Sequence, residues 1–149
     1  MASKKSWKEK ITESDNKGGI RKRTDKGMMY ISTPSEIAKL IRRVSKGKVT
    51  TTKYIAQKLK KKHKVDFTCP LTTGIFVSLV ANATEEAVAE GKKEIAPYWR
   101  VLKPGGKLYD KYLTHELPQR EHLEAEGFEI EEGKGKQPPK VKDFIQYLI

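Results

Sequence analysis

The segment Ile95-Ala96-Pro97-Tyr98-Trp99-Arg100-Val101-Leu102 places two large aromatic rings side by side between a proline and an arginine. Proline fixes its own φ and disfavours the helical region for the residue before it, so we predict an extended backbone at 96–98. Neighbouring side chains of an extended segment point to opposite faces. One of the rings of Tyr98 and Trp99 would then pack inward while the other faces a cleft. Burial of both rings in the core is the simpler alternative.

A tight turn follows this segment. Val101-Leu102, Lys103-Pro104-Gly105-Gly106-Lys107 and Leu108-Tyr109 have the pattern strand, turn, strand, which predicts a small β wing. Residues 118–126 are predicted to form a short helix with Gly127 as its C-cap. The chain would therefore leave the aromatic segment through a hairpin and return in a helix.

The C-terminal part of the chain differs in composition. Residues 131–140 are rich in Gly, Lys and Pro, which is typical of a linker. Residues 141–149 carry apolar side chains at helical spacing, and we predict a last helix that packs back onto the domain.

Upstream of the aromatic segment, the apolar pattern predicts three helices. Thr33-Pro34-Ser35-Glu36 combines an N-cap, a proline at the first helical position and a glutamate at the third, the capping-box arrangement. A second helix is predicted after the β-branched residues 49–52, and it ends in a run of lysines. A third helix is predicted over residues 70–90, with a core face formed by Ile75, Leu79, Val80, Ala83, Ala87 and Val88.

The second and third helices are separated by the short break Asp66-Phe67-Thr68-Cys69, and the third begins with small hydroxylated residues. This is the outline of a helix-turn-helix. Together with the wing, it predicts a mainly α fold with a small β wing. We place this domain at residues 28–130, between a basic N-terminal arm at 1–27 and the linker and C-terminal helix at 131–149.

The N-terminal arm contains nine Lys and Arg residues against four Asp and Glu residues. We predict a mobile arm in which Arg21-Lys22-Arg23 is the densest cluster of positive charge. Such a basic segment can be a solvated tail or can contact phosphates. Trp7 departs from this pattern, because a tryptophan in a free tail buries no surface. Docking of Trp7 on the domain is the alternative.

The charge of the whole chain favours a polyanionic partner. The formal net charge is +12, from 31 Lys and Arg residues and 19 Asp and Glu residues. Nucleic acid is the first candidate and an anionic membrane face the second. No apolar run approaches the ~18 residues of a membrane span, and no signal-peptide pattern opens the sequence. The one cysteine, Cys69, agrees with a reducing, cytoplasmic setting, which would be nucleoid-associated in a bacterium.

Recognisable catalytic motifs are missing from the sequence. It has no Gly-rich phosphate loop and no His-Glu-x-x-His, and one cysteine with the scattered His63, His115 and His122 predicts no metal site and no cofactor. His122 and Glu126, four residues apart on one predicted helix, are interpreted as a surface pair rather than a catalytic dyad. Cys69 would be a nucleophile only with a lowered pKa, and we favour a buried small hydrophobic residue.

The order of these elements resembles the DNA-binding domain of O6-alkylguanine-DNA alkyltransferases and of alkyltransferase-like proteins. In that family a helix-turn-helix leads into a Pro-Cys-His-Arg-Val segment, a Gly-containing turn and a helix ending in Glu-Gly. The matching places here are Pro97-Tyr98-Trp99-Arg100-Val101, Gly105-Gly106 and Leu123-Glu124-Ala125-Glu126-Gly127, with Gly47-Lys48-Val49-Thr50-Thr51 and Ile55-Ala56 upstream. The resemblance covers residues 34–128 and implies the winged helix-turn-helix of the alkyltransferase C-terminal domain.

The departures from this pattern change what the resemblance implies. Tyr98 replaces the alkyl-accepting cysteine and Trp99 the histidine after it, while Glu126 matches the family's supporting glutamate. A phenol with a pKa of about 10 is a poor nucleophile at neutral pH, so alkyl transfer is expected to be absent. The arginine that the family inserts into the duplex has no counterpart, because its place falls at Ala81 or Asn82.

We therefore predict a non-catalytic protein that binds double-stranded DNA, recognises O6-alkylguanine or other base damage in DNA repair, and does not bind membranes. It is expected to be a monomer, with DNA-repair proteins as further candidate partners. The predicted base pocket is Pro97, Tyr98, Trp99, Arg100 and Glu126. The predicted DNA contacts are Thr52, Lys60, Lys61, Lys62, Thr72, Thr73, Ser78, Asn82, Lys103 and Lys107. The alternatives are sequence-independent nucleic-acid binding without lesion recognition, and residual alkyl transfer by Cys69.

Overall fold

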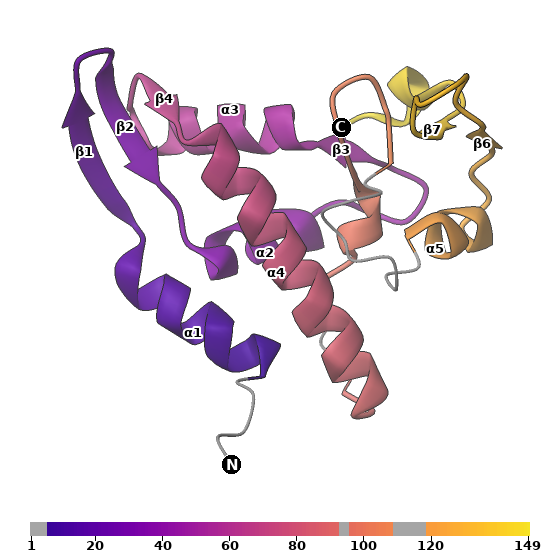
Figure 1. The fold of residues 1–149 in the computed structure, drawn as a ribbon, viewed down its shortest axis with the longest axis horizontal. Helices are drawn as coiled ribbons and strands as arrows, with labels where there is room; N and C mark the ends of the chain where they lie inside the picture. Colours follow the sequence, from indigo (N-terminus) through magenta and orange to yellow (C-terminus); the bar gives the residue numbers. More distant parts are fainter. Residues whose placement is uncertain (1–5, 93–95, 109–118) are drawn as a thin grey trace.

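The computed structural model describes residues 6–92, 96–108 and 119–149, which form a mixed α/β fold (Figure 1). The α-helices in these ranges are α1 (Trp7–Lys17), α2 (Pro34–Arg42), α3 (Thr52–His63), α4 (Pro70–Ala89) and α5 (Gln119–Ala125). The strands are β1 (Ile20–Thr24), β2 (Gly27–Ile31), β3 (Thr50–Thr51), β4 (Phe67–Thr68), β5 (Val101–Leu102), β6 (Ile130–Glu131) and β7 (Lys140–Val141). Short 3-10 helices are η1 (Tyr98–Arg100) and η2 (Phe144–Tyr147). The small sheets make the fold mixed rather than mainly α.

Helix α4 is the central element of the fold. Helices α1, α2 and α3 all pack against it, and it crosses the molecule diagonally in Figure 1. The core between these helices includes Ile37 and Ile41 of α2, Leu59 of α3, and Val77 and Val80 of α4, all at most 2% exposed. Burial of such side chains removes apolar surface from water and supplies the main driving force for packing.

The predicted core face of α4 is only partly correct. Val80 is buried, but the side chains of Ile75 and Val88 are 45% and 47% exposed. The helix is apolar on several sides, so the spacing of its apolar residues did not identify the face that the other helices cover.

None of the described helices is long and apolar enough to serve as a membrane span.

The starts of α2 and α3 follow their capping residues. The side chain of Thr33 accepts a hydrogen bond from the backbone N–H of Glu36 at 3.2 Å, and that of Thr51 accepts one from Tyr54 at 3.1 Å. Such caps satisfy donors that have no partner inside the helix. Both helix starts are therefore confirmed.

The capping box predicted at Glu36 does not close, because its carboxylate has other partners. It accepts hydrogen bonds from the Tyr30 hydroxyl at 2.8 Å and from Lys62 Nζ at 3.0 Å, and it lies 2.8 Å from His63 Nε2. Burial alone would raise the pKa of Glu36, but the bonds from His63, Tyr30 and Lys62 outweigh it and lower that pKa. The Tyr30 ring also stacks on the His63 ring, with 3.7 Å between the ring centroids. This cluster joins β2, α2 and α3.

Within the predicted N-terminal arm, residues 7–17 and 20–24 form α1 and β1. The backbone N–H of Trp7 donates to the Glu86 carboxylate of α4 at 3.2 Å, and α1 packs against α4. Strand β1 then pairs antiparallel with β2, from Ile20 opposite Ile31 to Thr24 opposite Gly27. The arm is held because helix packing and strand pairing satisfy its backbone groups, and the docking alternative for Trp7 agrees with this arrangement.

The predicted wing is a tight turn with one bridge rather than two paired strands. Lys103 N–H donates to the carbonyl of Lys107 at 2.9 Å, and Gly105 and Gly106 have φ of 86° and 79°, which favour glycine. An added methyl group at Gly106 would overlap the ring of Phe144. Tyr109, in the second predicted strand, lies outside the described residues.

The linker predicted from composition and the C-terminal helix predicted from apolar spacing are both wrong. Residues 131 and 140 instead pair in the antiparallel strands β6 and β7. The end of the chain then lies beside Val49, whose N–H donates to the Tyr147 carbonyl at 2.9 Å and whose carbonyl accepts from Ile149 at 3.2 Å. This pairing requires extended backbone at Leu148, so only the short 3-10 helix η2 forms.

Candidate nucleic-acid interface

The aromatic segment is compact and buried, not extended. Pro97 has φ −75° and ψ 68°, and Tyr98–Arg100 forms η1. The N–H of Tyr98 donates to the carbonyl of Ala96 at 2.7 Å and that of Arg100 to Pro97 at 3.1 Å. The side chain of Tyr98 is 0% exposed and that of Trp99 8%. The prediction that one ring faces a cleft is therefore corrected, because the 3-10 turn directs both rings inward.

Tyr98 is held by α4. Its hydroxyl donates to the Glu85 carboxylate at 2.7 Å. Burial raises the pKa of Tyr98 above its ordinary value, and the hydrogen bond and negative charge of Glu85 raise it further. The phenol is therefore an even poorer nucleophile than an exposed tyrosine.

Trp99 is stacked and hydrogen-bonded. Its ring lies 4.1 Å from that of His122 with an interplanar angle of 17°, and its Nε1 donates to Glu126 at 3.1 Å. His122 Nε2 lies 2.9 Å from the Glu85 carboxylate. The predicted surface pair of His122 and Glu126 is thus wrong, because each of them is engaged elsewhere in the aromatic cluster.

Arg100 links the aromatic segment to two other elements. Its Nε lies 2.8 and 3.0 Å from the two carboxylate oxygens of Glu126, and its Nη1 donates to the Val44 carbonyl at 2.6 Å. The two charged side chains are only 14% and 9% exposed. Burial alone would raise the pKa of Glu126, but the hydrogen bonds from Arg100 and Trp99 outweigh it and lower that pKa.

Gln119 binds the backbone of the aromatic segment, a role that was not predicted from the sequence. Its side chain is 2% exposed, and its Nε2 donates to the carbonyls of Val101 at 2.9 Å and Trp99 at 3.3 Å. A single glutamine in a polar stretch gives no sequence signal for such a role. It fixes the backbone that carries both rings.

The five predicted base-pocket residues do come together in space. Glu126 reaches Trp99 and Arg100, and the rings of Tyr98 and Trp99 touch edge to face at 5.3 Å. The rings fill this position, however, and do not stand at the edge of an open cleft. The arrangement holds a backbone turn and a buried ion pair, and it presents no exposed nucleophile among these residues.

The residues of α4 that were predicted to contact DNA differ in how far they are buried. Thr73 is 2% exposed and donates to the Cys69 carbonyl at 3.1 Å, and Asn82 is 9% exposed and donates to the Ser78 carbonyl at 2.9 Å. Both side chains are buried and bonded within α4, and their contact with DNA stays a prediction. Thr72 is half-buried, as are Ser78 itself and Cys69.

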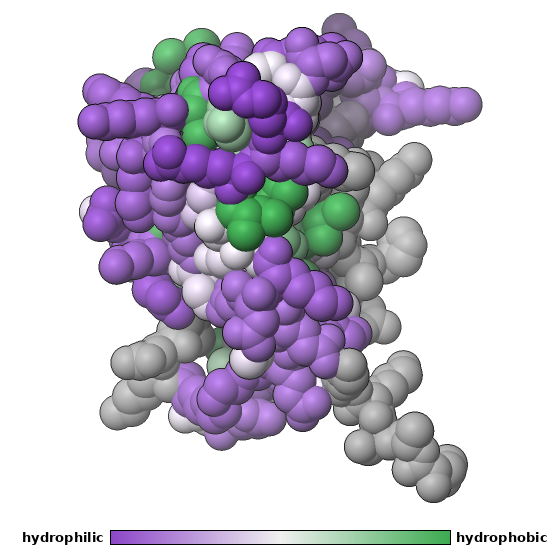
Figure 2. Space-filling view, turned by 90° about the vertical axis from the view of Figure 1, so that its left-hand side faces the viewer, coloured by the Kyte–Doolittle hydropathy of each residue, from purple (hydrophilic) through white to green (hydrophobic). Residues whose placement is uncertain are grey.

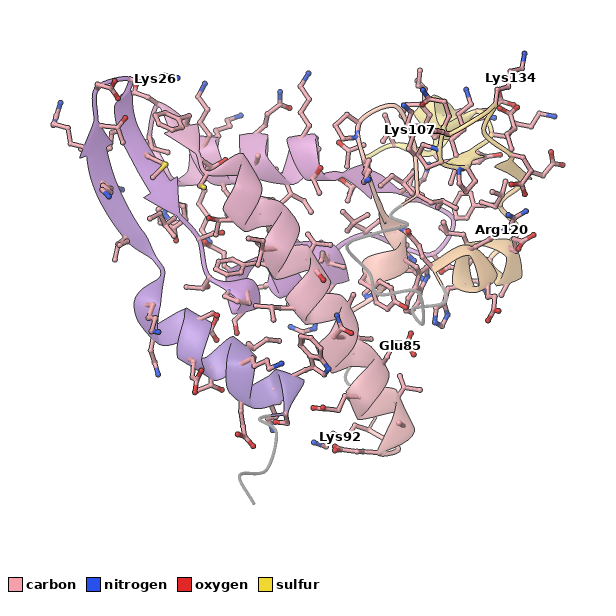
Figure 3. The ribbon with its side chains drawn as sticks, in the orientation of Figure 1. Lys26, Glu85, Lys92, Lys107, Arg120 and Lys134 are labelled. Atoms are coloured by element: carbon pink, nitrogen blue, oxygen red, sulfur yellow. The ribbon has the colours of Figure 1, made fainter. Side chains whose placement is uncertain are left out.

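The predicted phosphate contacts lie mostly at the surface. Lys60 and Lys61 of α3 are exposed, Lys62 is bound to Glu36, and Thr52 is half-buried. On the wing turn Lys103 is half-buried, and Lys107 Nζ donates to the Gln137 side chain at 2.9 Å. Figure 3 shows Lys107 at the upper edge of the molecule, the same edge as Lys26.

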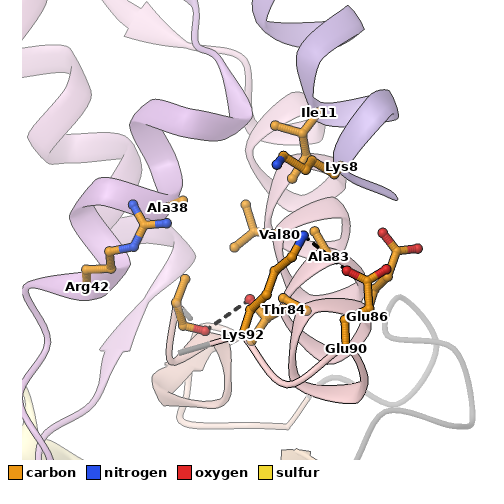
Figure 4. A pocket seen from close by; sticks show the side chains of 12 residues that line it. Lys8, Ile11, Ala38, Arg42, Val80, Ala83, Thr84, Glu86, Glu90 and Lys92 are labelled. Carbon is orange, nitrogen blue, oxygen red and sulfur yellow. Dashed lines mark hydrogen bonds and ion pairs between the residues drawn. The ribbon is translucent and has the colours of Figure 1, made fainter. Parts of the chain in front are cut away.

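A cavity lies outside the predicted site, between α1, α2 and α4 (Figure 4). Its volume is about 240 Å3, and its lining combines apolar side chains with charged ones of both signs. Arg42 points into it from α2, and Lys92 pairs with Glu90 at 3.1 Å. Within the described ranges no cluster of three or more metal-ligating side chains occurs.

Comparison with known proteins shows the fold. No protein-family model and no curated protein sequence matches the chain. A crystal structure of S. pombe Atl1 in complex with damaged DNA containing O6-carboxymethylguanine is similar, with a TM-score of 0.57, 19% sequence identity, and coverage of 78% of this chain and 93% of that chain. A structure of the S. pombe protein in complex with DNA has a TM-score of 0.54 and 18% identity, with the same coverage. Over most of its length, the chain therefore has the fold of the alkyltransferase-like protein Atl1.

Proposed function

We propose that this chain is a non-catalytic protein that binds double-stranded DNA, as the alkyltransferase-like resemblance implies. The observation that carries the proposal is a basic chain, with a net charge of +12, on the fold of a protein whose crystal structures contain DNA. Exposed Lys60 and Lys61, with Lys107 on the wing turn, supply cations for phosphate contacts.

Binding is expected to depend strongly on salt. If about six phosphates are neutralised, log affinity should fall with log salt at a slope of about −5. Fluorescence anisotropy of a labelled duplex at several salt concentrations measures this slope. A flat response, or no retention of duplex at low salt, would sink the proposal.

Lesion recognition is the second candidate function, because the similar Atl1 structure is a complex with damaged DNA containing O6-carboxymethylguanine. It would require Trp99 to leave its stack with His122, since both rings now fill the predicted pocket. Titrating matched duplexes with and without O6-methylguanine distinguishes the two functions. Equal affinities support binding without lesion recognition, and tighter binding of the modified duplex supports a pocket that opens.

Alkyl transfer is expected to be absent. Tyr98 is buried with a raised pKa, and Cys69 is only partly exposed at the start of α4. Intact-protein mass spectrometry after incubation with DNA containing O6-methylguanine should show no methyl adduct. An adduct mapped to Cys69 or Tyr98 would contradict the non-catalytic assignment.

A further inference from the structure

The β1–β2 hairpin carries a cluster of cations that the proposed interface does not include. Arg21, Lys22, Arg23 and Lys26 are exposed, and none of the four forms an ion pair within the described part of the chain. Asp25 is the acidic residue of the same hairpin. Figure 2 views the molecule from the hairpin side, where the surface is mostly hydrophilic around a small group of hydrophobic side chains.

The cations of β1 lie on both faces of the hairpin. Directly opposite residues of an antiparallel pair share a face. Arg21 pairs with Tyr30 and Lys22 with Met29, so successive cations alternate between the two faces. A two-stranded ribbon is narrow enough for the major groove of B-DNA, and exposed cations on it can contact phosphates.

The hairpin is fixed to the turn between α3 and α4. Strand β2 pairs in parallel with β4, which belongs to this turn, and the N–H of Met28 donates to the Asp66 carboxylate at 2.7 Å. The N–H of Asp66 donates back to the Met28 carbonyl at 2.9 Å. Gly27 permits this approach, because its φ is 122° and a Cβ there would strike the Asp66 side chain. These contacts attach the hairpin to the turn that precedes α4.

The hairpin also adjoins the lysine-rich end of α3. Tyr30 of β2 stacks on His63, and Glu36 binds both of these residues together with Lys62. Lys60, Lys61 and Lys64 are exposed on the same stretch of chain. In Figure 1 the hairpin and the wing turn reach the same edge of the molecule with α3 between them.

We propose that the β1–β2 hairpin is a second wing, which contacts the phosphates of duplex DNA beside the start of α4. This inference rests on the proposed DNA binding and extends it to an element outside the resemblance at 34–128. The hairpin carries exposed Arg21, Lys22, Arg23 and Lys26, and the end of α3 adds exposed Lys60, Lys61 and Lys64. Strand pairing fixes the backbone of the hairpin before DNA binds, which reduces the entropy cost of the contacts.

The test compares two variants with the same loss of charge. R21Q/K22Q/R23Q removes three positive charges from the hairpin. K8Q/K10Q/K92Q removes two from α1 and one, Lys92, from the segment after α4, and Figure 3 shows Lys92 at the edge opposite Lys26. If the hairpin neutralises three phosphates, its variant should bind duplex at least about tenfold more weakly than the control variant, with a salt slope shallower by about 2 to 3. The control variant should keep the slope of the natural chain.

A gain-of-binding variant guards against a folding defect. D25N removes the acidic residue of the hairpin and should tighten duplex binding, which misfolding cannot do. If the natural chain binds duplex and the hairpin variant behaves like the control, the second-wing proposal is overturned while DNA binding stands. If the natural chain does not bind duplex, the proposed function itself fails. A hairpin variant that loses RNA binding but keeps duplex DNA binding would overturn the choice of DNA as partner.

Discussion

Replacing Arg100 with alanine is expected to lower the free energy of unfolding by about 3–5 kcal/mol, because it leaves the buried carboxylate of Glu126 without its cation. The two side chains are 14% and 9% exposed, and the guanidinium also donates to the Val44 carbonyl at 2.6 Å. Trp99 Nε1 would remain as a donor to Glu126, but it carries no charge. Chemical denaturation followed by circular dichroism measures the change.

A matched control for this prediction is Arg120→Ala. Arg120 also pairs with two carboxylates, those of Glu124 and Glu132, but its side chain is 44% exposed. Water and salt screen such a pair, so the unfolding midpoint should stay close to that of the natural chain. If both variants unfold at the same denaturant concentration, the buried ion pair is not a main source of stability.

Truncation of Tyr98 is the second large expected effect. Tyr98 is among the largest fully buried side chains, and Tyr98→Ala should cost about 3–5 kcal/mol through lost packing and the cavity that remains. The substitution therefore removes a fully buried side chain from the core. Thermal unfolding and denaturant titration should both show the loss.

The conservative variant Tyr98→Phe separates the ring from its hydroxyl. It keeps the packing and removes the hydrogen bond to Glu85, while His122 stays within 2.9 Å of that carboxylate. The free energy of unfolding should fall by about 1 kcal/mol, and duplex affinity should not change.

A Tyr98→Ala protein as stable as the natural one would show that the ring is not part of the core in solution.

Elements with strong local signals could be predicted from the sequence. Thr33 and Thr51 cap α2 and α3 where expected, and α4 begins at Pro70 as predicted and ends at Ala89, next to the predicted end at 90. The signals succeed because caps and helix-opening prolines act on the first turn alone. The alkyltransferase-like outline follows from these helices and the turn after them, but the small sheets that make the fold mixed do not.

Elements that depend on distant partners could not be predicted. Strand β1 is mostly Lys and Arg, and only its pairing with β2 makes it a strand. The C-terminal residues have helical spacing but pair with Val49, which lies far back in the sequence. At the candidate site, Pro97 suggested extended backbone, whereas Gln119 and Glu126 hold a compact turn from another part of the chain. Tertiary contacts override local preference at these places.

Arg100 reaches Val44, 56 residues before it, and Glu126, 26 residues after it. Substitutions at Arg100 and Glu126 should therefore be strongly non-additive, since removing both charges avoids the unpaired one that either single change leaves behind. A lineage that loses one member is expected to lose the other as well. Positions 100 and 126 should therefore vary together in related sequences, whereas position 44 should vary independently, because Arg100 binds only its backbone carbonyl.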